Sequence, residues 1–395
     1  MTQPHIGLPK AHLGLLAVFG STLFQLSGIF MLSPLLLLIL KGADVSTTVA
    51  GLFAATTWLG IFVMTPFASL VTQRLGRRLA MWLASTMPLV AATGFLLTDS
   101  LWVWFLLELV AGIAGGLRWV LAEAFIAEFA PPGQTGRYIG MYATMVGVTF
   151  VIGPSVLAWV GADSPFALWV VVALLAFGLA WTALIPPMPL EKDAHSARVG
   201  LHGLWHALKA HPVIMLAGFV GGFFELGLAS ILPLYGLALG LTASAAALLV
   251  SVSGIGGTVA ALPAGMVADR FASPAQGRRT MMAGLTALIL VSTFATPFME
   301  QASWLIWPVA CVWGATGGAL YTLAMIDIGT REQGVTLVNS TAVLVLSYTL
   351  GGLVASAASG ALIQWTPTEG FPALLVTVAG VGLFALVRNR QSGSI

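Results

Sequence analysis

The sequence contains 395 residues, of which 58% are apolar and only 8% are charged. A soluble domain is about half apolar and about a quarter charged, so this composition excludes an ordinary soluble protein and indicates a polytopic membrane protein. The formal net charge of +2 gives no reason to expect a nucleic-acid partner. The single cysteine, Cys311, excludes an intrachain disulfide and a cysteine metal cluster.

Long apolar segments recur along the whole chain. A membrane-spanning helix needs about 20 mostly apolar residues, and unpaired strand edges are too costly in lipid, so helices are expected rather than barrel strands. The first segment is too long for a signal peptide and is expected to be a retained helix. Twelve segments meet the requirement: 12–39, 46–71, 78–98, 101–127, 137–160, 165–186, 211–237, 242–267, 279–299, 303–327, 335–363 and 370–388.

The basic residues give the twelve segments an orientation. The chain has sixteen Lys and Arg, of which Arg118 lies within a segment. If the segments cross the membrane in alternating directions, Lys41 falls on one side of the membrane and the other fourteen fall on the opposite side. The positive-inside rule therefore places both termini in the cytoplasm. Tryptophans predicted to anchor the other membrane surface precede two of the segments, and they are Trp102, Trp104, Trp304 and Trp307.

The two halves of the chain repeat one another. Phe24-Gln25-Leu26 matches Phe224-Glu225-Leu226 at an offset of 200, and a Gly-rich set in segment 4 matches one in segment 10 at an offset of 202. Parallel halves of this kind form a binding site at their interface near the bilayer midplane. The predicted fold is all-α, with two parallel six-helix bundles over residues 1–187 and 211–395.

A polar linker, residues 188–210, separates the two halves. Leu201, Leu204, Trp205 and Leu208 fall on one helical face, which predicts an amphipathic helix at the cytoplasmic membrane surface. His202 and His206 have a spacing that can bind a metal, and His211 is near. No further ligand type lies nearby, so solvated linker histidines are favoured and no metal site is expected.

A basic hairpin follows segment 2 and recurs after segment 8. The first copy reads Ser69-x-x-x-Gln73-Arg74-x-Gly76-Arg77-Arg78; the second reads Gly265-x-x-x-Asp269-Arg270, an insertion, and Gly277-Arg278-Arg279. Through these motifs the whole chain resembles the major facilitator superfamily, whose loop between helices 2 and 3 reads G-x-x-x-D-R-x-G-R-R. The resemblance implies a cytoplasmic gate of Asp269, Arg270, Gln73, Arg74, Arg77 and Arg78. Gln73 replaces the acid of the first copy and cannot carry its charge, whereas Asp269 retains it.

The resemblance also implies a function. The superfamily consists of secondary transporters, so we expect a small-molecule substrate, a lipid bilayer as surroundings, the bacterial inner membrane as location, and a monomer. No cofactor is expected, because a proton gradient would drive transport. Gly153-Pro154 resembles the helix-5 kink of antiporters in this family, which favours efflux, although simple helix packing explains the same residues. The family's usual helix-4 arginine aligns with Glu108, a departure from drug antiporters.

Ionisable residues inside the membrane are costly, about 2.5–3.5 kcal/mol each on lenient scales, and so require a reason. Glu225 is the first choice for the proton-coupling carboxyl, and its repeat mate Gln25 cannot titrate. Arg118 is expected to meet a carboxylate on another helix or a substrate oxygen, rather than nearby Glu123. Asp327 is expected at the membrane interface. The predicted proton-coupling and substrate residues are Glu225, Arg118, Glu123, Gln25, Trp119, Phe224, Tyr321 and Glu108.

Three function classes remain to be weighed. The favoured one is a transporter that exports a small neutral or cationic organic compound in exchange for protons, with proton-linked uptake of a metabolite as the alternative. An enzyme is not expected, because the chain contains no H-E-x-x-H, G-x-S-x-G or C-x-x-C motif. A non-transporting receptor or scaffold is the alternative from a different class, and it predicts no transport role for Glu225, Glu123 or Arg118.

Overall fold

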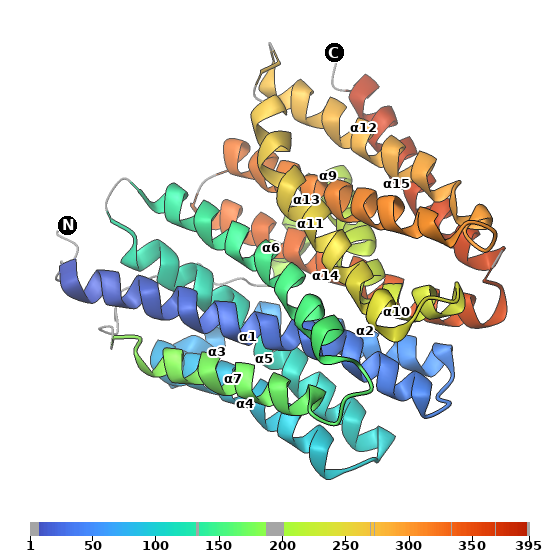
Figure 1. The fold of residues 1–395 in the computed structure, drawn as a ribbon. Helices are drawn as coiled ribbons and strands as arrows, with labels where there is room; N and C mark the ends of the chain where they lie inside the picture. The colour runs from blue at the N-terminus through green and yellow to red at the C-terminus, as the bar shows by residue number, and fades with distance from the viewer. Residues whose placement is uncertain are drawn as a thin grey trace.

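The computed structural model describes residues 8–131, 134–186, 201–268, 270–271, 273–332, 334–367 and 369–392, and within these ranges it consists of helices and short connections, without strands (Figure 1). The predicted gate residue Asp269 lies outside the described residues. The N-terminal half contains α1 Leu8–Gly42, α2 Thr47–Met64, η1 Thr65–Phe67, α3 Ala68–Leu75, α4 Arg77–Leu97, α5 Leu101–Phe129, α6 Thr135–Val160 and α7 Ala167–Ala183.

The C-terminal half repeats this order after a short connecting helix, α8 Leu201–Ala210. Its elements are α9 Pro212–Gly222, η2 Phe223–Gly227, α10 Leu228–Ala238, α11 Ala243–Ala268, α12 Pro274–Thr293, η3 Thr296–Phe298, η4 Ser303–Leu305, α13 Ile306–Arg331, α14 Gly334–Trp365 and α15 Gly370–Ser392. Four predicted spans are composite: α2, η1 and α3 run on as one, α9, η2 and α10 as another, α12 and η3 as a third, and η4 and α13 as a fourth.

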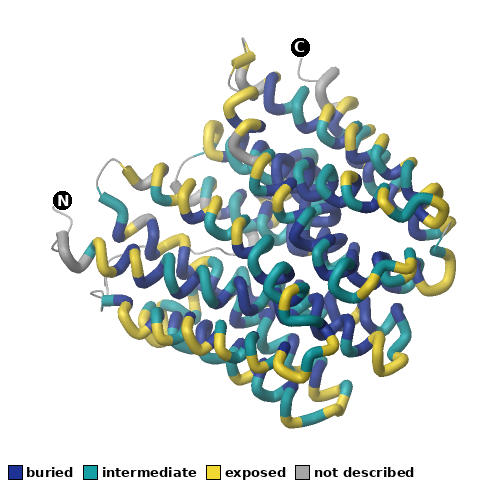
Figure 2. Tube along the Cα trace, in the orientation of Figure 1, coloured by how far each residue is buried: buried dark blue, intermediate teal, exposed yellow. Residues whose placement is uncertain are grey.

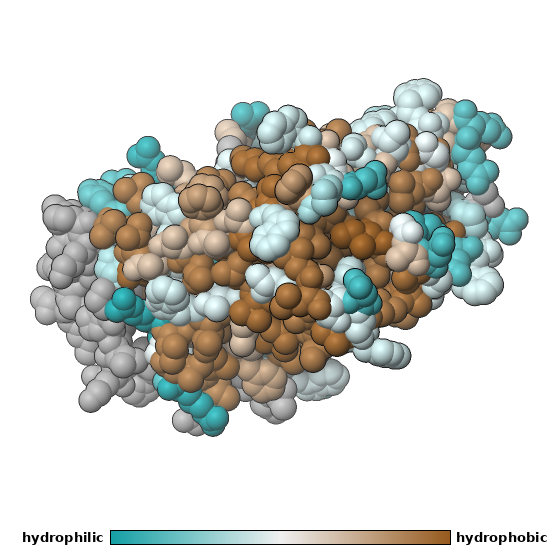
Figure 3. Space-filling model, turned by 60° about the horizontal axis from the view of Figure 1, so that its bottom comes forward, coloured by the Kyte–Doolittle hydropathy of each residue, from teal (hydrophilic) through white to brown (hydrophobic). Residues whose placement is uncertain are grey.

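The predicted spans correspond to helices of the structure. Within the described residues, 11 spans are long and apolar enough to cross a membrane, and the shorter apolar helix α7 occupies the remaining predicted segment, 165–186. Figure 3 shows hydrophobic residues over the middle of one face, with hydrophilic residues gathered toward its ends. A protein surface that crosses a bilayer needs an apolar middle, because that part contacts the hydrocarbon core.

Exposed aromatic side chains ring one end of the molecule. They come from the ends of helices in both halves, and they are Trp102, Trp159, Phe166, Trp169, Phe294, Phe298, Trp304 and Trp365. Aromatic belts of this kind mark a membrane–water interface. Trp104, in contrast, is buried beside Phe95 and Phe53, so it packs within the N-terminal half and is not the surface anchor that was predicted. We call this end the aromatic end, and the opposite end, which carries Arg77, Arg278 and Arg331, the basic end.

Glycines set the spacing of helices in the same way in each half. A Cβ atom at Gly153 would lie 2.6 Å from the Ser27 carbonyl oxygen, and one at its repeat mate Gly351 would lie 2.2 Å from the Phe219 carbonyl oxygen. The fifth helix of each half therefore packs with its backbone against the first, as small residues allow in membrane helices. Gly153-Pro154 therefore takes part in helix packing, which the sequence offered as the alternative to an antiporter-type kink.

The two halves join along two long seams, α2 against α14 and α6 against α11. At the aromatic end the seam is closed, because Gly51 and Gly360 meet backbone to backbone and the Thr48 N–H donates to Gln364 Oε1 at 2.8 Å. Toward the basic end, where α1 begins and α15 ends, the halves diverge, and α5 and α13 make no extensive contact (Figure 1). Figure 2 shows buried residues concentrated where the halves converge. The halves are therefore in close contact at the aromatic end, and their helices spread apart toward the basic end (Figure 1).

The connecting helix α8 packs against α14. Leu204 and Ala207 are buried in this contact, whereas Trp205 and Leu208 remain exposed, and Lys209 Nζ lies 5.0 Å above the Trp205 ring. The amphipathic helix is thus present, but its predicted apolar face is divided between protein contact and exposed surface.

Candidate functional site

Glu225 lies on an irregular turn in the middle of the seventh span. Residues Phe223–Gly227 form a single π-helical turn, closed by the Leu228 N–H donating to the Phe223 carbonyl oxygen. A π turn inserts one extra residue into a helix and changes the direction in which the side chains after it point, and such turns are frequent at functional sites. The turn aims Glu225 toward α11, α13 and α14.

Three glycines and a tyrosine surround the Glu225 carboxyl group. A Cβ atom at either Gly257 or Gly318 would lie 2.9 Å from Glu225 Oε1, and one at Gly317 would lie 2.7 Å from the Glu225 Cβ. The Tyr348 hydroxyl donates to Glu225 Oε2. The carboxyl thus has room only because these positions lack side chains, and it has one neutral hydrogen-bond donor and, among the described residues, no cationic partner.

Gln25, the repeat mate of Glu225, points in a different direction. Its Nε2 donates to the carbonyl oxygens of Ser85 and Leu175, at 3.0 and 3.2 Å, and its side chain is fully buried inside the N-terminal half. The prediction that Gln25 lines the substrate cavity is therefore wrong. The first span lacks the π turn of the seventh, so residues at matching sequence positions face different neighbours.

Aromatic rings from both halves meet at the centre of the molecule. Trp119 and Tyr321, repeat mates at an offset of 202, lie in one cluster with Phe150 and Tyr348, repeat mates at an offset of 198. The rings of Tyr321 and Tyr348 are 4.6 Å apart. Trp58 completes the cluster and donates across the interface to Ser230 Oγ at 3.1 Å. We call the rings of Trp119, Phe150, Tyr321 and Tyr348 the aromatic quartet.

Glu123 stands beside this quartet on the side of the N-terminal half. The Trp119 Nε1–H donates to Glu123 Oε1 at 2.8 Å, and Glu123 is exposed although it lies within a membrane span. Glu225, on the other side, bonds to the Tyr348 ring of the same quartet. Two carboxyl groups, one from each half, therefore bond to rings of the aromatic quartet.

Arg118 faces away from the interface. Its guanidinium donates to Ser85 Oγ at 2.7 Å, to Ser21 Oγ at 2.8 Å and to Thr22 Oγ1 at 3.3 Å, and the residue is 3% exposed. The predicted carboxylate partner on another helix is wrong, because its side-chain partners in the described chain are neutral hydroxyls. A substrate oxygen as its partner stays a prediction. The expectation that it does not pair with Glu123 agrees with this arrangement.

Two further predicted site residues also lie inside a half rather than at the interface. Glu108 is buried and accepts a hydrogen bond from the Thr57 hydroxyl, which joins α5 to α2. Phe224 is fully buried and packs edge-on against Trp313 within the C-terminal half. Neither residue forms part of a cavity wall, because the helix faces that carry them pack against neighbouring helices. Of the predicted set, Glu225, Glu123, Trp119 and Tyr321 are those that the structure brings together.

Comparison with known proteins identifies the architecture. The sequence profile of the Major Facilitator Superfamily matches residues 18–341. The chain belongs to the Major Facilitator Superfamily. It is therefore a membrane transporter and not an enzyme.

Relatives of this transporter include two that are named only as uncharacterized MFS-type transporters. YfkF of Bacillus subtilis is 22% identical over 372 residues, which cover 92% of each chain. YcaD of Escherichia coli O7:K1 is 24% identical over 387 residues, which cover 95% of each chain. Among solved structures, the nucleoside transporter NupG has a TM-score of 0.75 at 12% identity, covering 98% of this chain and 99% of NupG. The xylose transporter XylE of E. coli, in a partially occluded inward-open conformation, has a TM-score of 0.72 at 13% identity, covering 96% and 97%.

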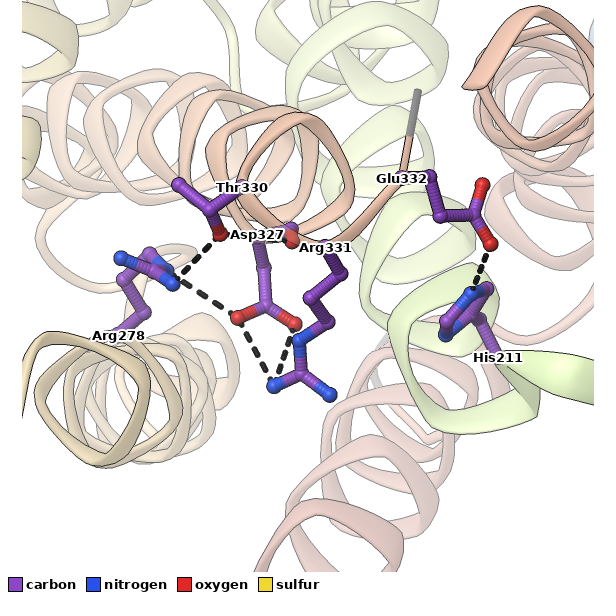
Figure 4. Close-up of polar contacts among 6 residues, drawn as sticks. All are labelled: His211, Arg278, Asp327, Thr330, Arg331 and Glu332. Carbon is purple, nitrogen blue, oxygen red and sulfur yellow. Dashed lines mark hydrogen bonds and ion pairs between the residues drawn. The ribbon is translucent and has the colours of Figure 1, made fainter. Parts of the chain in front are cut away.

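The basic end of the transporter carries an arginine–carboxylate pair in each half. Arg77, at the start of α4, binds Glu128 in the last turn of α5, and Arg278, near the start of α12, binds Asp327 near the end of α13 at 3.1 Å (Figure 4). Arg331 also contacts Asp327, at 3.0 Å. Asp327 is fully buried within the protein at the basic end, and its position at the membrane interface stays a prediction.

These pairs were not predicted as partners, because the acids lie fifty residues along the chain from the arginines they bind. The Arg77–Glu128 and Arg278–Asp327 pairs each join two helices of one half, whereas the Arg331–Asp327 pair lies within α13. Arg74, Arg78 and Arg270 are exposed, and Gly76 adopts φ +80°, which lets the chain turn between α3 and α4. The gate residues that the structure describes, Gln73, Arg74, Arg77, Arg78 and Arg270, thus lie at the basic end, whereas their role as a gate stays a prediction.

His211, which was weighed as a metal ligand, instead binds a carboxylate. Its Nε2 lies 2.6 Å from Glu332 Oε1, a contact between the start of α9 and the end of α13 (Figure 4). Groups of three or more His, Cys, Asp or Glu that could hold a metal ion are absent from the described part of the chain. This contact gives His211 a structural role in the C-terminal half.

Proposed function

We propose that this transporter couples the movement of a small organic solute to protons by alternating access, with the solute bound between the halves at the aromatic quartet. The observation that carries the proposal is the position of Glu225. It is a carboxyl group at mid-membrane depth, held by Tyr348 in a space that three glycines leave open. An intramembrane carboxyl without a cationic partner is costly, and proton binding is the usual reason for retaining one.

The structure offers a physical route for the coupling. Glu225 lies beside Tyr348 and Tyr321, which belong to the interface between the halves. A motion of one half against the other changes the surroundings of this interface, and with them the exposure of Glu225 to each side of the membrane. Efflux is the proposed direction, with cytoplasmic termini in a bacterial inner membrane, and the transporter is proposed to act as a monomer.

A substitution at Glu225 tests the coupling. A metabolite and drug panel is first screened by thermal shift, since a ligand that binds only the folded protein raises its melting temperature. The radiolabelled hit is then followed in proteoliposomes with an imposed proton gradient. Glu225→Gln should abolish gradient-driven accumulation and leave solute exchange without a gradient intact.

Glu108→Gln is the matched control, because it removes another buried intramembrane carboxyl that bonds to Thr57 away from the interface. It should retain gradient-driven accumulation. Normal gradient-driven rates in Glu225→Gln would remove this residue from the mechanism. Repeating the assay with the opposite gradient separates efflux from proton-linked uptake, and a hit that binds but is never moved would favour a receptor.

A further inference from the structure

The ionisable side chains that contact the aromatic quartet are carboxyl groups. Glu123 bonds to the Trp119 indole from the N-terminal half, and Glu225 bonds to the Tyr348 hydroxyl from the C-terminal half. Arg118 is the one Lys or Arg in the interior of the twelve spans predicted from the sequence, because Arg78, Arg137, Arg279 and Arg388 are terminal residues of theirs. Its guanidinium is held inside the N-terminal half by hydroxyls of α1 and α4. The one positive charge that could have balanced the carboxyls is therefore turned away from the site.

The quartet itself adds to this negative character. The face of an aromatic ring is electron-rich and attracts a cation lying above it, by about 0.5–2 kcal/mol depending on how dry the site is. Rings contributed by both halves, such as Trp119 and Tyr321, can contact one bound group from two sides. A site between low-dielectric walls also concentrates the field of its carboxylates.

Glu123 is suited to bind a charge directly. Its Oε1 is oriented by the Trp119 indole, its carboxylate is exposed, and it has no cationic partner among the described residues. Glu225, in contrast, is enclosed by Tyr348 and glycines within the C-terminal half. The two carboxyls therefore differ in their surroundings, since Glu123 is exposed and Glu225 is enclosed.

We propose that the transported solute carries a positively charged nitrogen attached to an apolar, ring-sized body, with Glu123 as the anchor of the cation and the aromatic quartet as the surface that receives the body. This inference rests on the proposed function, because it uses the same interface as the transport site. It narrows the substrate class from neutral or cationic solutes to organic amines.

Matched probes test the substrate class. Arylethylamines with one, two and three fused rings are each compared with the alcohol and the carboxylate on the same skeleton. Dissociation constants are measured by equilibrium dialysis against purified transporter. For at least one ring size the amine should bind at least about tenfold more tightly than its alcohol, and the carboxylate should bind more weakly still. Equal binding of alcohol and amine, tighter binding of a carboxylate, or no binding of any amine at millimolar concentration would overturn the proposal.

Variants then locate the cation. Glu123→Gln should weaken binding of the best amine at least about tenfold and leave binding of the matched alcohol unchanged. Glu108→Gln, which removes a carboxyl that bonds to Thr57 inside the N-terminal half, should leave both unchanged. An equal loss in Glu123→Gln and Glu108→Gln, or no loss in Glu123→Gln, would contradict the assignment of Glu123.

Failure of this inference is distinguishable from failure of the proposed function. If no amine binds but Glu225→Gln still abolishes gradient-driven accumulation of another compound, the substrate class is wrong and proton coupling stands. If amines bind through Glu123 but Glu225→Gln accumulates them normally, the substrate class stands and the coupling residue is wrong.

Discussion

Two arginine–carboxylate ion pairs differ in burial, and this difference determines how much each contributes to the free energy of unfolding. The side chains of Arg77 and Glu128 are 33% and 34% exposed, whereas those of Arg278 and Asp327 are 5% and 0% exposed. An exposed pair contributes little because water already solvates both charges, typically about 0–1 kcal/mol. A buried pair is costly to break, because the remaining charge stays without a partner in a dry place.

Neutralising the two acids should therefore have unequal effects. Asp327→Asn leaves the buried Arg278 without its counter-ion and should lower the free energy of unfolding by about 3–5 kcal/mol. Glu128→Gln should lower it by about 1 kcal/mol or less. The measurement is reversible unfolding of each purified variant in mixed micelles with increasing SDS. Equal losses in the two variants would show that burial does not distinguish the pairs.

Individual residues show what sequence patterns miss. Glu225 was identifiable because a carboxyl in an apolar run is rare, and Trp119 and Tyr321 because the repeat pairs them. Tyr348 was missed, since a tyrosine in an apolar run gives no signal until the π turn aims Glu225 at it. Arg118 could not be placed, because helical spacing gives its angle on its own helix but not which neighbours cover that face.

At the scale of elements, the apolar runs and the repeat predicted the twelve spans and their order, because lipid imposes both length and composition on each helix. Their irregularities were not predictable. The π turn at Phe223–Gly227 depends on contacts with three other helices, and the division of α8 between protein contact and exposed surface depends on the position of α14. The hydrophobic pattern of the sequence reflects contact with the bilayer, whereas the π turn and the packing of α8 depend on specific neighbouring helices.

The closest helix approaches in the C-terminal half depend on glycine. A Cβ atom at Gly351 would lie 2.2 Å from the Phe219 carbonyl oxygen and 2.7 Å from the Phe223 nitrogen, both backbone atoms that cannot move aside alone. Gly351→Ala should push α14 from α9 and lower the free energy of unfolding by about 1–3 kcal/mol. The same SDS unfolding measurement checks this.

Gly380→Ala is the control for that substitution, because nothing lies within 4 Å of a Cβ at Gly380, which also lies inside a helix. It should leave stability unchanged or raise it slightly, since alanine favours a helix over glycine. A Gly351→Ala variant as stable as Gly380→Ala would mean that the helices adjust without cost.

At the scale of the whole molecule, the two halves behave as bodies joined at the aromatic end and separated at the basic end. Alternating access requires that the closed seam opens in another state. One contact across this seam suits a covalent test, because Ser155 Oγ on α6 and Ser251 Oγ on α11 lie 3.2 Å apart. Side chains this close are compatible with the Cβ separation of a disulfide, about 3.5–4.5 Å.

A disulfide at this position should stop transport by holding the halves together on one side. In a Cys311→Ala background, which removes the single native cysteine, Ser155→Cys combined with Ser251→Cys is oxidised and reconstituted. Solute exchange should fall to the background of protein-free liposomes and return on reduction, because the crosslink keeps the aromatic end closed. Each single cysteine variant, treated identically, should keep its exchange rate. Undiminished exchange by the fully crosslinked protein would mean that the halves need not separate along α6 and α11 for the solute to cross.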